Sequence, residues 1–212
     1  MKEGKFITIE GTEGAGKSTA LQFIQDYLIQ ANKQVVLTRE PGGTEIAEEI
    51  RKILLHSSPQ EKMQPETELL LMFAGRAQHI QTCIIPALSA GKWVVSDRYI
   101  DASYAYQGGG RGMDWQQIKT LDQLVVKNSH PDLTLLLDIP AELGCARAEK
   151  RGAPKDRIEQ EKIDFFVRVR NAYLERAKHD PKRIKVIDAS RELSAVQVQM
   201  RRVLDEFLLG NR

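Results

Sequence analysis

Residues 11–18 read Gly11-Thr12-Glu13-Gly14-Ala15-Gly16-Lys17-Ser18, and they are the strongest signal of the fold in the chain. It has the pattern G-x4-G-K-S and lies between an apolar run that ends at Glu10 and a segment of helical pattern that begins at Lys17. Glycines let consecutive backbone N–H groups point toward one centre, and the N-terminus of the following helix adds partial positive charge there. The stretch therefore predicts a phosphate-binding loop (P-loop).

The residue types of this loop indicate which of them bind phosphate and which binds Mg²⁺. Lys17 is expected to reach the β and γ phosphates of a nucleoside triphosphate, and the Ser18 hydroxyl is expected to ligate Mg²⁺. The residues expected to contact the triphosphate belong to the loop and the first turn of the helix: Gly11, Thr12, Glu13, Gly14, Ala15, Gly16, Lys17, Ser18 and Thr19. An accidental glycine-rich turn is the alternative, and the position between strand and helix disfavours it.

The rest of the chain alternates between strand and helix patterns. Five runs rich in Val, Ile and Leu predict strands at 6–10, 35–39, 93–97, 133–139 and 184–188. They are continuous rather than alternating, which is typical of strands covered on both faces, as in a parallel sheet. Helices are predicted at 17–32, 65–90, 114–128, 141–151, 159–178 and 193–209. The predicted fold is an α/β P-loop NTPase: one domain over 1–212 with a doubly wound, five-stranded parallel sheet flanked by helices.

Composition excludes several classes of protein. Hydrophobic residues make up 42% and charged residues 28%, which is ordinary for a globular chain. The 31 Lys and Arg against 29 Asp and Glu leave a net charge of +2, too small to attract a nucleic acid polymer or an anionic membrane. No apolar run approaches the roughly 20 residues of a membrane span, and the first residues carry charges where a signal peptide would be apolar. We therefore expect a cytoplasmic protein.

Two kinds of local feature remain. Cys83 and Cys145 lack the spacing of a zinc site or a disulfide framework, so both are predicted to be buried, reduced thiols. The glycine-containing segments 108–112 and 151–154 are predicted to be mobile loops.

A P-loop alone is compatible with switches, motors and kinases. GTPases recognise guanine with the pattern Asn-Lys-x-Asp. The most similar stretch of this chain, residues 127–129, does not match that pattern. Motor ATPases are usually larger and need a sensor region, for which 212 residues leave little room. A small phosphotransferase is therefore favoured.

A second anion site is predicted beside the loop. Arg39 follows the second strand and Arg98 follows the third, so both should lie at the carboxyl edge of the sheet with the P-loop. A guanidinium pairs in two ways with a phosphate, so these residues suit an acceptor phosphate, although a strand-end arginine is often only a surface ion-pair partner. Asp97 is predicted to bind Mg²⁺, directly or through water, and Asp138 is the competing candidate.

Six motifs in order resemble those of the bacterial thymidylate kinase (dTMP kinase) family, within the P-loop nucleoside monophosphate kinases. They are Ile9-Glu10-Gly11-Thr12-Glu13-Gly14-Ala15-Gly16-Lys17-Ser18, Thr38-Arg39-Glu40-Pro41-Gly42-Gly43-Thr44, Leu71-Met72-Phe73-Ala74-Gly75-Arg76, Ser96-Asp97-Arg98-Tyr99, Ala105-Tyr106-Gln107-Gly108-Gly109-Gly110-Arg111 and Asp156-Arg157-Ile158-Glu159. The likeness runs from about residue 5 to 188. The second and fourth motifs are far more specific than the loop.

The resemblance implies a nucleoside site. It implies that Phe73 stacks on thymine and that Arg76 contacts a base carbonyl. It places Ser103, Tyr106 and Gln107 along the base and sugar, with Tyr106 crowding the sugar C2′ and disfavouring ribonucleotides. The sequence pattern alone favours a core residue at Phe73, and the resemblance reverses that interpretation.

The resemblance also assigns the phosphate end. Glu13 would hold the sugar 3′-hydroxyl or the phosphate-binding arginine, and Arg39 and Arg98 would clamp the acceptor phosphate. The loop has no arginine at its variable positions, so the resemblance points to a basic lid at about 147–159, with Arg151 as its catalytic arginine and Arg157 as the second choice. The catalytic set expected is Lys17, Arg98, Arg151 and Glu13.

The expected activity is ATP-dependent phosphorylation of dTMP to dTDP, for dTTP biosynthesis, by direct in-line phosphoryl transfer with Mg²⁺. A phosphate monoester is already ionised near neutral pH because its second pKa is about 6, so no strong general base is needed. The partners expected are dTMP, ATP and a second copy of the chain in a homodimer. A kinase of another deoxynucleotide or deoxynucleoside is the alternative, and a nucleotide-dependent switch protein is a remote one.

Overall fold

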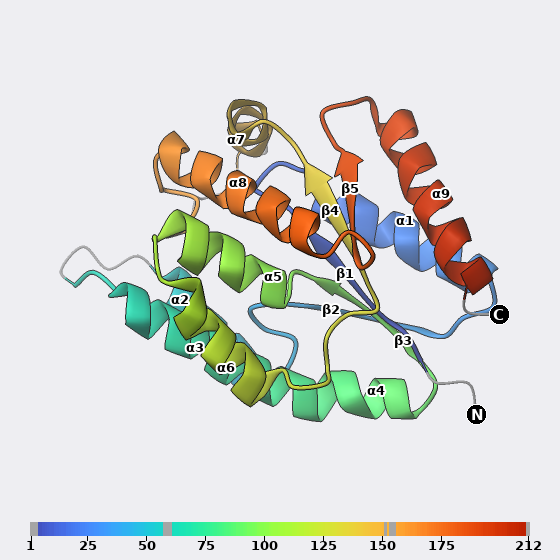
Figure 1. Cartoon of the computed structure of the whole chain (residues 1–212), viewed down its shortest axis with the longest axis horizontal. Coiled ribbons are helices and arrows are strands. Elements are labelled where there is room, and N and C mark those ends of the chain that lie inside the picture. The colour runs from blue at the N-terminus through green and yellow to red at the C-terminus, as the bar shows by residue number, and fades with distance from the viewer. Residues whose placement is uncertain (1–3, 57–60, 151, 153–155, 211–212) are drawn as a thin grey trace.

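A five-stranded parallel sheet runs through the centre of the molecule, in the order β2-β3-β1-β4-β5 (Figure 1). The computed structural model describes residues 4–56, 61–150, 152 and 156–210. The strands are β1 (Phe6–Glu10), β2 (Val35–Arg39), β3 (Trp93–Asp97), β4 (Leu133–Asp138) and β5 (Ile184–Asp188). Asp97 is the register partner of both Ile9 and Arg39, so three strands end side by side. The predicted fold class is confirmed.

Helices fill the connections between the strands. The α-helices are α1 (Lys17–Gln30), α2 (Glu45–Leu55), α3 (Pro65–His79), α4 (Ile85–Ser89), α5 (Ile100–Ser103), α6 (Trp115–Val125), α7 (Ala141–Glu149), α8 (Ile163–His179) and α9 (Leu193–Gly210). Two π-helical segments, η1 (Ile80–Ile84) and η2 (Tyr104–Gly110), continue α3 and α5. The single helix predicted over 65–90 is thus α3, η1 and α4 in succession, and α2 was not predicted.

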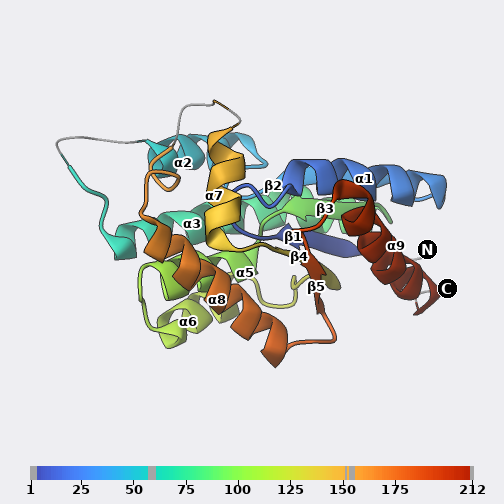
Figure 2. The same cartoon turned by 90° about the horizontal axis from the view of Figure 1, so that it is seen from above.

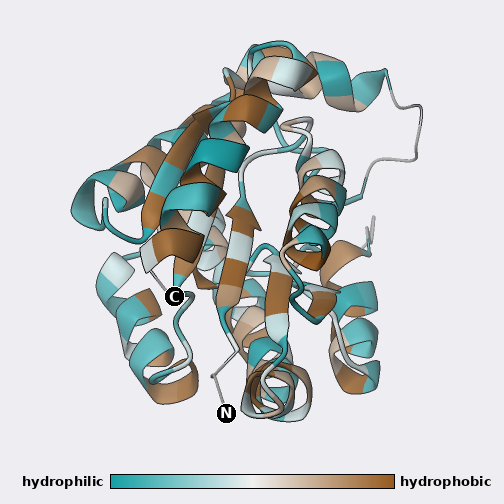
Figure 3. Cartoon of the chain, turned by 90° about the vertical axis from the view of Figure 1, so that its right-hand side faces the viewer, coloured by the Kyte–Doolittle hydropathy of each residue, from teal (hydrophilic) through white to brown (hydrophobic). Residues whose placement is uncertain are grey.

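Both faces of the sheet are covered. Ile7 and Ile9 of β1 pack with α1 and α9 on one face, whereas Phe6 packs with the α3 to α6 region on the other. Figure 2 shows α1 and α8 on opposite sides of the strands. Hydrophobic residues dominate the strands and only parts of the helices (Figure 3), as two-sided burial requires. Within the described residues, no helix combines the length and hydrophobicity needed to cross a membrane.

The segment predicted as a mobile loop at 108–112 is instead packed structure up to Gly110. A Cβ atom added to Gly109 would lie 2.5 Å from the Cβ of Ala172 and 2.9 Å from the carbonyl oxygen of Arg168, both on α8. These glycines therefore let η2 and α8 approach closely, so the mobile-loop prediction is wrong here. In the other predicted loop, residues 151, 153 and 154 lie outside the described residues.

We predict that Gly109→Ala lowers the free energy of unfolding by about 1–3 kcal/mol, because the added methyl overpacks the η2–α8 contact. Gly210→Ala is the matched control, since no atom of the described residues outside its chain neighbours and its own helix backbone lies within 4 Å of the added Cβ. Urea unfolding midpoints of the two variants and the parent chain measure the difference. Equal midpoints for all three would contradict the close packing.

Candidate active site

The P-loop joins β1 to α1 and is supported from behind by α7. Lys17 Nζ donates hydrogen bonds to the carbonyl oxygens of Gly11 and Thr12, at 3.1 and 2.9 Å. At Gly14, which has a φ of 71°, a Cβ would lie 2.0 Å from the carbonyl oxygen of Gly144 in α7, so only glycine fits. Burial lowers the pKa of Lys17 to about 8, and the positive charge of Arg98 contributes to the shift. An anion at the loop would oppose both effects.

Glu13, Arg98 and Tyr106 form a compact cluster beside the loop. Arg98 Nη2 donates to Glu13 Oε1 at 2.7 Å and to the Tyr106 hydroxyl at 2.8 Å, and the Tyr106 hydroxyl donates to Glu13. Burial alone would raise the pKa of Glu13, but the charges of Arg98 and Lys17 outweigh it and lower that pKa. Glu13 is therefore an anion held between two cations.

Arg98 has an unusual backbone conformation, which directs its side chain toward this cluster. Its φ of 67° lies in the left-handed region, which costs a non-glycine residue on the order of 1–3 kcal/mol. Two hydrogen bonds hold the conformation: Arg98 N donates to the Ile9 carbonyl oxygen at 2.9 Å, and Ser96 Oγ donates to the Arg98 carbonyl oxygen at 2.8 Å. The buried Nε of Arg98 has no hydrogen-bond partner among the described residues, so it can serve a ligand.

A cavity of about 380 Å³, here called the phosphate cavity, opens over the loop. Its lining comprises Glu13, Gly14, Gly16, Lys17, Ser18, Thr19, Arg51, Asp97, Arg98, Arg147, Asp156 and Glu159. Lys17 reaches it from the loop, and Arg98 reaches it from the end of β3. The structure thus brings the predicted donor and acceptor cations into one space.

Arg51 is a lining residue that sequence reasoning missed, because α2 was not predicted. Its Nη1 donates to the Pro41 carbonyl oxygen at 2.8 Å. A helix signal was present, since Thr44 is the N-cap of α2 and Glu45 and Glu48 lie in the first turn. Arg51 follows Glu48 by one turn and faces the phosphate cavity.

The two candidate metal ligands have different surroundings. Arg170 holds both carboxylate oxygens of Asp138, with Nε–Oδ1 and Nη2–Oδ2 distances of 2.7 and 2.9 Å. Asp97 lines the phosphate cavity with Ser18, and its buried Oδ1 has no hydrogen-bond partner within the part of the chain that the structure describes. Asp97 is thus the carboxylate that remains available beside the loop.

Arg39 lies at the edge of a neighbouring space of about 460 Å³, here called the Arg39 cavity. This cavity is lined by Ser18, Leu21, Leu37, Thr38, Arg39, Gly43, Glu48, Cys83 and Asp97. Arg39 Nη2 donates to Glu48 Oε2 at 3.0 Å, and its side chain is 54% exposed. Ser18 and Asp97 line both cavities, so the two cavities adjoin. Arg98 lines the phosphate cavity and Arg39 lines the Arg39 cavity. Cys83, which also lines the Arg39 cavity, is half-buried, so the prediction of a buried thiol is wrong.

The residues expected around a base fall into two groups. Arg76 is buried, donates to Glu40 Oε2 and Ser103 Oγ at 2.8 and 2.9 Å, and lies 4.8 Å from the Phe73 ring centroid. Gln107 instead donates to Glu68 Oε1 at 2.8 Å, and its own buried Oε1 has no hydrogen-bond partner in residues 4–56, 61–150, 152 and 156–210. Phe73, Arg76 and Ser103 are therefore together, whereas Tyr106 turns toward Glu13 and Gln107 toward Glu68.

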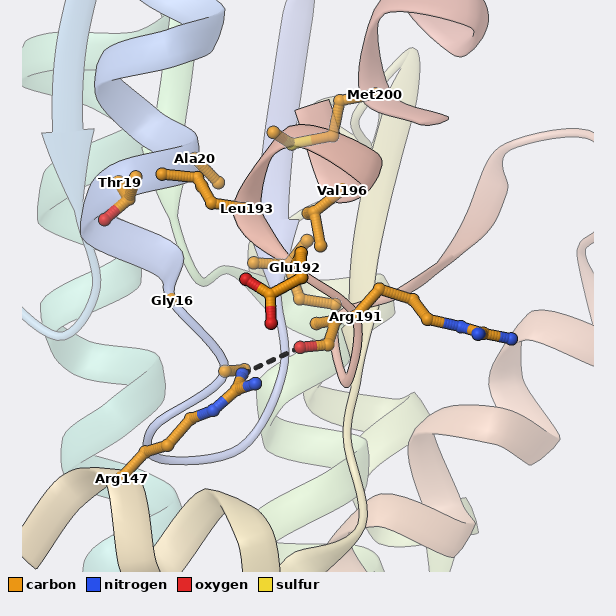
Figure 4. Close-up of a pocket in the computed structure, with 12 residues that line it drawn as sticks. Gly16, Thr19, Ala20, Arg147, Arg191, Glu192, Leu193, Val196 and Met200 are labelled. Atoms are coloured by element: carbon orange, nitrogen blue, oxygen red, sulfur yellow. Dashed lines mark hydrogen bonds between the residues drawn. The ribbon is translucent and has the colours of Figure 1, made fainter. Parts of the chain in front are cut away.

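A further cavity of about 210 Å³, here called the α9 cavity, lies between the P-loop and the start of α9 (Figure 4). Arg147 of α7 points across it and donates to the carbonyl oxygens of Ala189 and Ser190, at 2.8 and 3.2 Å. Val196 and Met200 supply an apolar wall. Residues 188–191 carry no recognisable motif, so the sequence alone does not identify this cavity.

The predicted lid is described in part. Arg151 lies outside the described residues. Arg147 lies in the α9 cavity, and Arg157 Nη2 lies 2.6 Å from Glu68 Oε2 while its Nε donates to the Leu54 carbonyl oxygen at 2.9 Å. Arg157 therefore ties the end of the basic segment to α2 and α3.

Comparison with known proteins agrees with this geometry. The thymidylate kinase family profile matches residues 9–200. The chain is 55% identical over 204 residues to a thymidylate kinase of Ruthia magnifica subsp. Calyptogena magnifica, covering 96% of this chain and 98% of that protein. It is 53% identical over 208 residues to one of Chromohalobacter salexigens, covering 98% of each. The crystal structure of thymidylate kinase from Ehrlichia chaffeensis superposes with a TM-score of 0.76 at 33% identity, covering 95% of this chain and 99% of that one.

A phosphate cavity reached by Lys17 and Arg98 and a likeness that spans nearly the whole chain lead to one conclusion: the chain belongs to the thymidylate kinase family.

Proposed function

We propose that the protein phosphorylates dTMP to dTDP with ATP, by direct in-line transfer, as a step toward dTTP. The observation that carries the proposal is the phosphate cavity, which Lys17 and Arg98 enter from different elements of the fold. Phosphoryl transfer between two phosphates brings two anions together, so cations must face the donor and the acceptor in one space. A single 380 Å³ cavity lined by both cations meets that requirement.

The donor is proposed to lie along the P-loop and the α9 cavity. Backbone N–H groups of the loop and Lys17 would hold the triphosphate. The α9 cavity adjoins the loop through Gly16 and Thr19 and offers apolar Val196 and Met200 beside the Arg147 guanidinium. An adenine ring suits such a site, because it stacks on a planar cation and excludes water from apolar side chains.

The acceptor is proposed to lie on the other side of the phosphate cavity. Arg98, with Arg39 beyond it, would hold the dTMP phosphate, and Glu13 would orient Arg98 or accept a bond from the sugar 3′-hydroxyl. Tyr106, bonded to both Glu13 and Arg98, would lie against the sugar. The base would lie toward Phe73, Arg76, Ser103 and Gln107.

The residues around Asp97 fit Mg²⁺. This ion prefers oxygen ligands, keeps several waters and is usually held by one or two carboxylates together with substrate phosphates. Asp97 Oδ1 is buried, without a hydrogen-bond partner from the described residues, in the cavity that Ser18 also lines. These two side chains would hold the ion, which when bound neutralises charge on the phosphate oxygens.

The chain's own groups then position the reactants. Lys17 and Arg98 fix the two phosphates, and no side chain needs to remove a proton, because the acceptor phosphate is already ionised with a second pKa of about 6. We propose that the segment at about 147–159 acts as a lid that excludes water, with Arg151 supplying charge at the transferred group.

We also propose that the chain forms a homodimer through α2 and α3. Ile46, Ile53 and Leu70 are large apolar side chains on these packed helices and are more than half exposed, at 55%, 55% and 58%. A second copy packed there would remove them from water.

We predict ADP release that depends on dTMP. Among dTMP, dUMP, dCMP, dGMP and dAMP, dTMP should be the best acceptor, and dUMP should follow at about 10- to 200-fold lower kcat/KM, because one methyl group gives only limited discrimination. A coupled assay with each acceptor measures this. A different best acceptor would indicate another nucleotide kinase, and ADP release without acceptor dependence would indicate a switch or simple ATPase.

We predict that Arg98→Ala weakens dTMP binding by roughly 10- to 100-fold, because hydrogen bonds to charged groups contribute about 1.5–3 kcal/mol. Binding of a non-hydrolysable ATP analogue should change little, and calorimetry with each ligand makes the comparison. Arg202→Ala is the matched control, since among the described residues Arg202 pairs only with Glu206 on the surface of α9, where its side chain is 83% exposed. Equal loss of both ligands in Arg98→Ala would argue against the acceptor clamp.

We predict the opposite selectivity for Arg147→Ala. Loss of the bonds to Ala189 and Ser190 and of the cation beside the α9 cavity should weaken the ATP analogue roughly tenfold. Binding of dTMP alone should be retained. A variant that binds the analogue normally but loses dTMP would show that the donor base lies elsewhere.

A further inference from the structure

Glu10 is a fully buried carboxyl group that the proposed reaction does not use. It is the last residue of β1 and directly precedes Gly11, where the P-loop begins. Its Oε1 accepts a hydrogen bond from Tyr99 N at 2.7 Å, and its Oε2 accepts one from the Tyr173 hydroxyl at 2.6 Å. Burial of a carboxyl group is costly unless hydrogen bonds satisfy it, and these two bonds do so. The bond from Tyr99 connects Glu10 to the active site.

The bond from Tyr99 fixes the peptide unit that follows Arg98. The N–H of this unit, which belongs to Tyr99, donates to Glu10, and its oxygen, which belongs to Arg98, accepts from Ser96 Oγ at 2.8 Å. The peptide unit that precedes Arg98 is held on its other side, since Arg98 N donates to the Ile9 carbonyl oxygen at 2.9 Å. The orientation of two flanking planar peptide units sets the φ and ψ of the residue between them. These bonds therefore fix the left-handed φ of 67° at Arg98.

Water cannot replace Glu10 as the partner of this N–H group. Tyr99 is fully buried, and a buried backbone donor without an acceptor is strongly unfavourable. A non-glycine residue also keeps a left-handed backbone only where the surrounding structure enforces it. Removal of the Glu10 acceptor should therefore release the constraint on the Tyr99 side of Arg98, and the Arg98 guanidinium should lose its fixed position.

The groups around Glu10 leave it an acceptor in either protonation state. Burial and the charge of Asp101 raise the pKa of Glu10 to about 7, whereas the bonds from Tyr173 and Tyr99 and the charge of Arg98 oppose the rise. A carboxylate accepts at both oxygens, and a neutral carboxyl group keeps one oxygen that carries no proton. Tyr99 N therefore retains its acceptor through the titration, and an amide side chain in place of Glu10 should also supply one.

We propose that Glu10 is a positioning residue for the acceptor phosphate: through the Tyr99 backbone it holds the left-handed turn at Arg98 and keeps the guanidinium in the phosphate cavity. Glu13 and Tyr106 bind the guanidinium end of the same side chain, at 2.7 and 2.8 Å. Both ends of Arg98 are thus fixed before a ligand arrives, which lowers the entropy cost of binding. The role of Glu10 rests on the proposed function, in which Arg98 holds the dTMP phosphate.

Calorimetry with dTMP on variants of the full chain tests this role. Glu10→Ala removes the acceptor of Tyr99 N and should weaken dTMP binding about tenfold, because a buried donor is left unpaired beside Arg98. Glu10→Gln keeps an acceptor oxygen of the same reach and should bind dTMP within about threefold of the parent chain. A non-hydrolysable ATP analogue should bind to both variants almost as it binds to the parent. Equal loss of the two ligands in Glu10→Ala, or no loss of dTMP binding, would overturn the proposal.

A double-mutant cycle separates positioning of Arg98 from general support of the fold. In the Arg98→Ala background, Glu10→Ala should change dTMP affinity by less than about twofold, because the group that Glu10 positions is absent. A tenfold loss that persists in this background would show that Glu10 acts through another group. The acceptor assay on the parent chain tests the proposed function separately: dTMP-dependent ADP release together with an uncoupled cycle overturns the role of Glu10 alone.

Tyr173→Phe is the matched control, since it removes the other hydrogen bond to Glu10 and leaves the bond from Tyr99. It should lower the urea midpoint but bind dTMP as the parent chain does, and a loss of dTMP binding as large as that of Glu10→Ala would overturn the proposal. Should Glu10→Ala fold poorly, Glu10→Asp takes its place, because the carboxylate is then one methylene too short to reach Tyr99 N. Glu10→Asp should bind dTMP more weakly than Glu10→Gln, and equal affinities would overturn the role of this bond.

Discussion

The site depends on one carboxylate placed between two cations. Lys17 and Arg98 repel each other, and this repulsion contributes to the lowered pKa of Lys17. Glu13 lies beside both and is bonded to Arg98 at 2.7 Å, so it acts as their counter-ion. A buried pair of cations without such a partner would be costly. Glu13 therefore stabilises Lys17 and Arg98 as neighbouring cations until bound phosphates provide further negative charge.

The parallel sheet explains how distant residues meet there. Glu13 follows β1, Arg98 follows β3 and Arg39 ends β2, and the register aligns Ile9, Asp97 and Arg39 across these strands. Parallel strands place all their carboxyl ends at one edge, where loops can approach one ligand. The left-handed backbone at Arg98 then turns its side chain back over the P-loop, and its hydrogen bond to the Ile9 carbonyl oxygen stabilises that turn.

The sequence allowed site residues to be predicted where they directly follow the strands of the sheet. The P-loop pattern, Asp97 and Arg98 could be placed at one sheet edge because strand ends and their sequence positions suffice for that inference. The bond between Glu13 and Tyr106 could not be predicted from spacing, since it joins residues 93 positions apart through the packing of η2. Gly109 was misread for a related reason: a glycine needed for close helix packing and a glycine in a loop look alike in a sequence. α2 was missed although Thr44 and the acidic residues after it are a recognisable helix N-terminus signal.

Both described ends of the basic segment are anchored, which bears on the missing arginine of the P-loop. Arg147 is tied to the loop after β5, and Arg157 is tied to Glu68. Glu68 also binds Arg111 and Gln107, so the second anchor is connected to η2. Because Arg147 and Asp156 line the phosphate cavity, the two ends of the segment meet at the same ligand space. Arg147, which is far from the P-loop in sequence, therefore adds a positive charge to the cavity that Lys17 of the loop also lines.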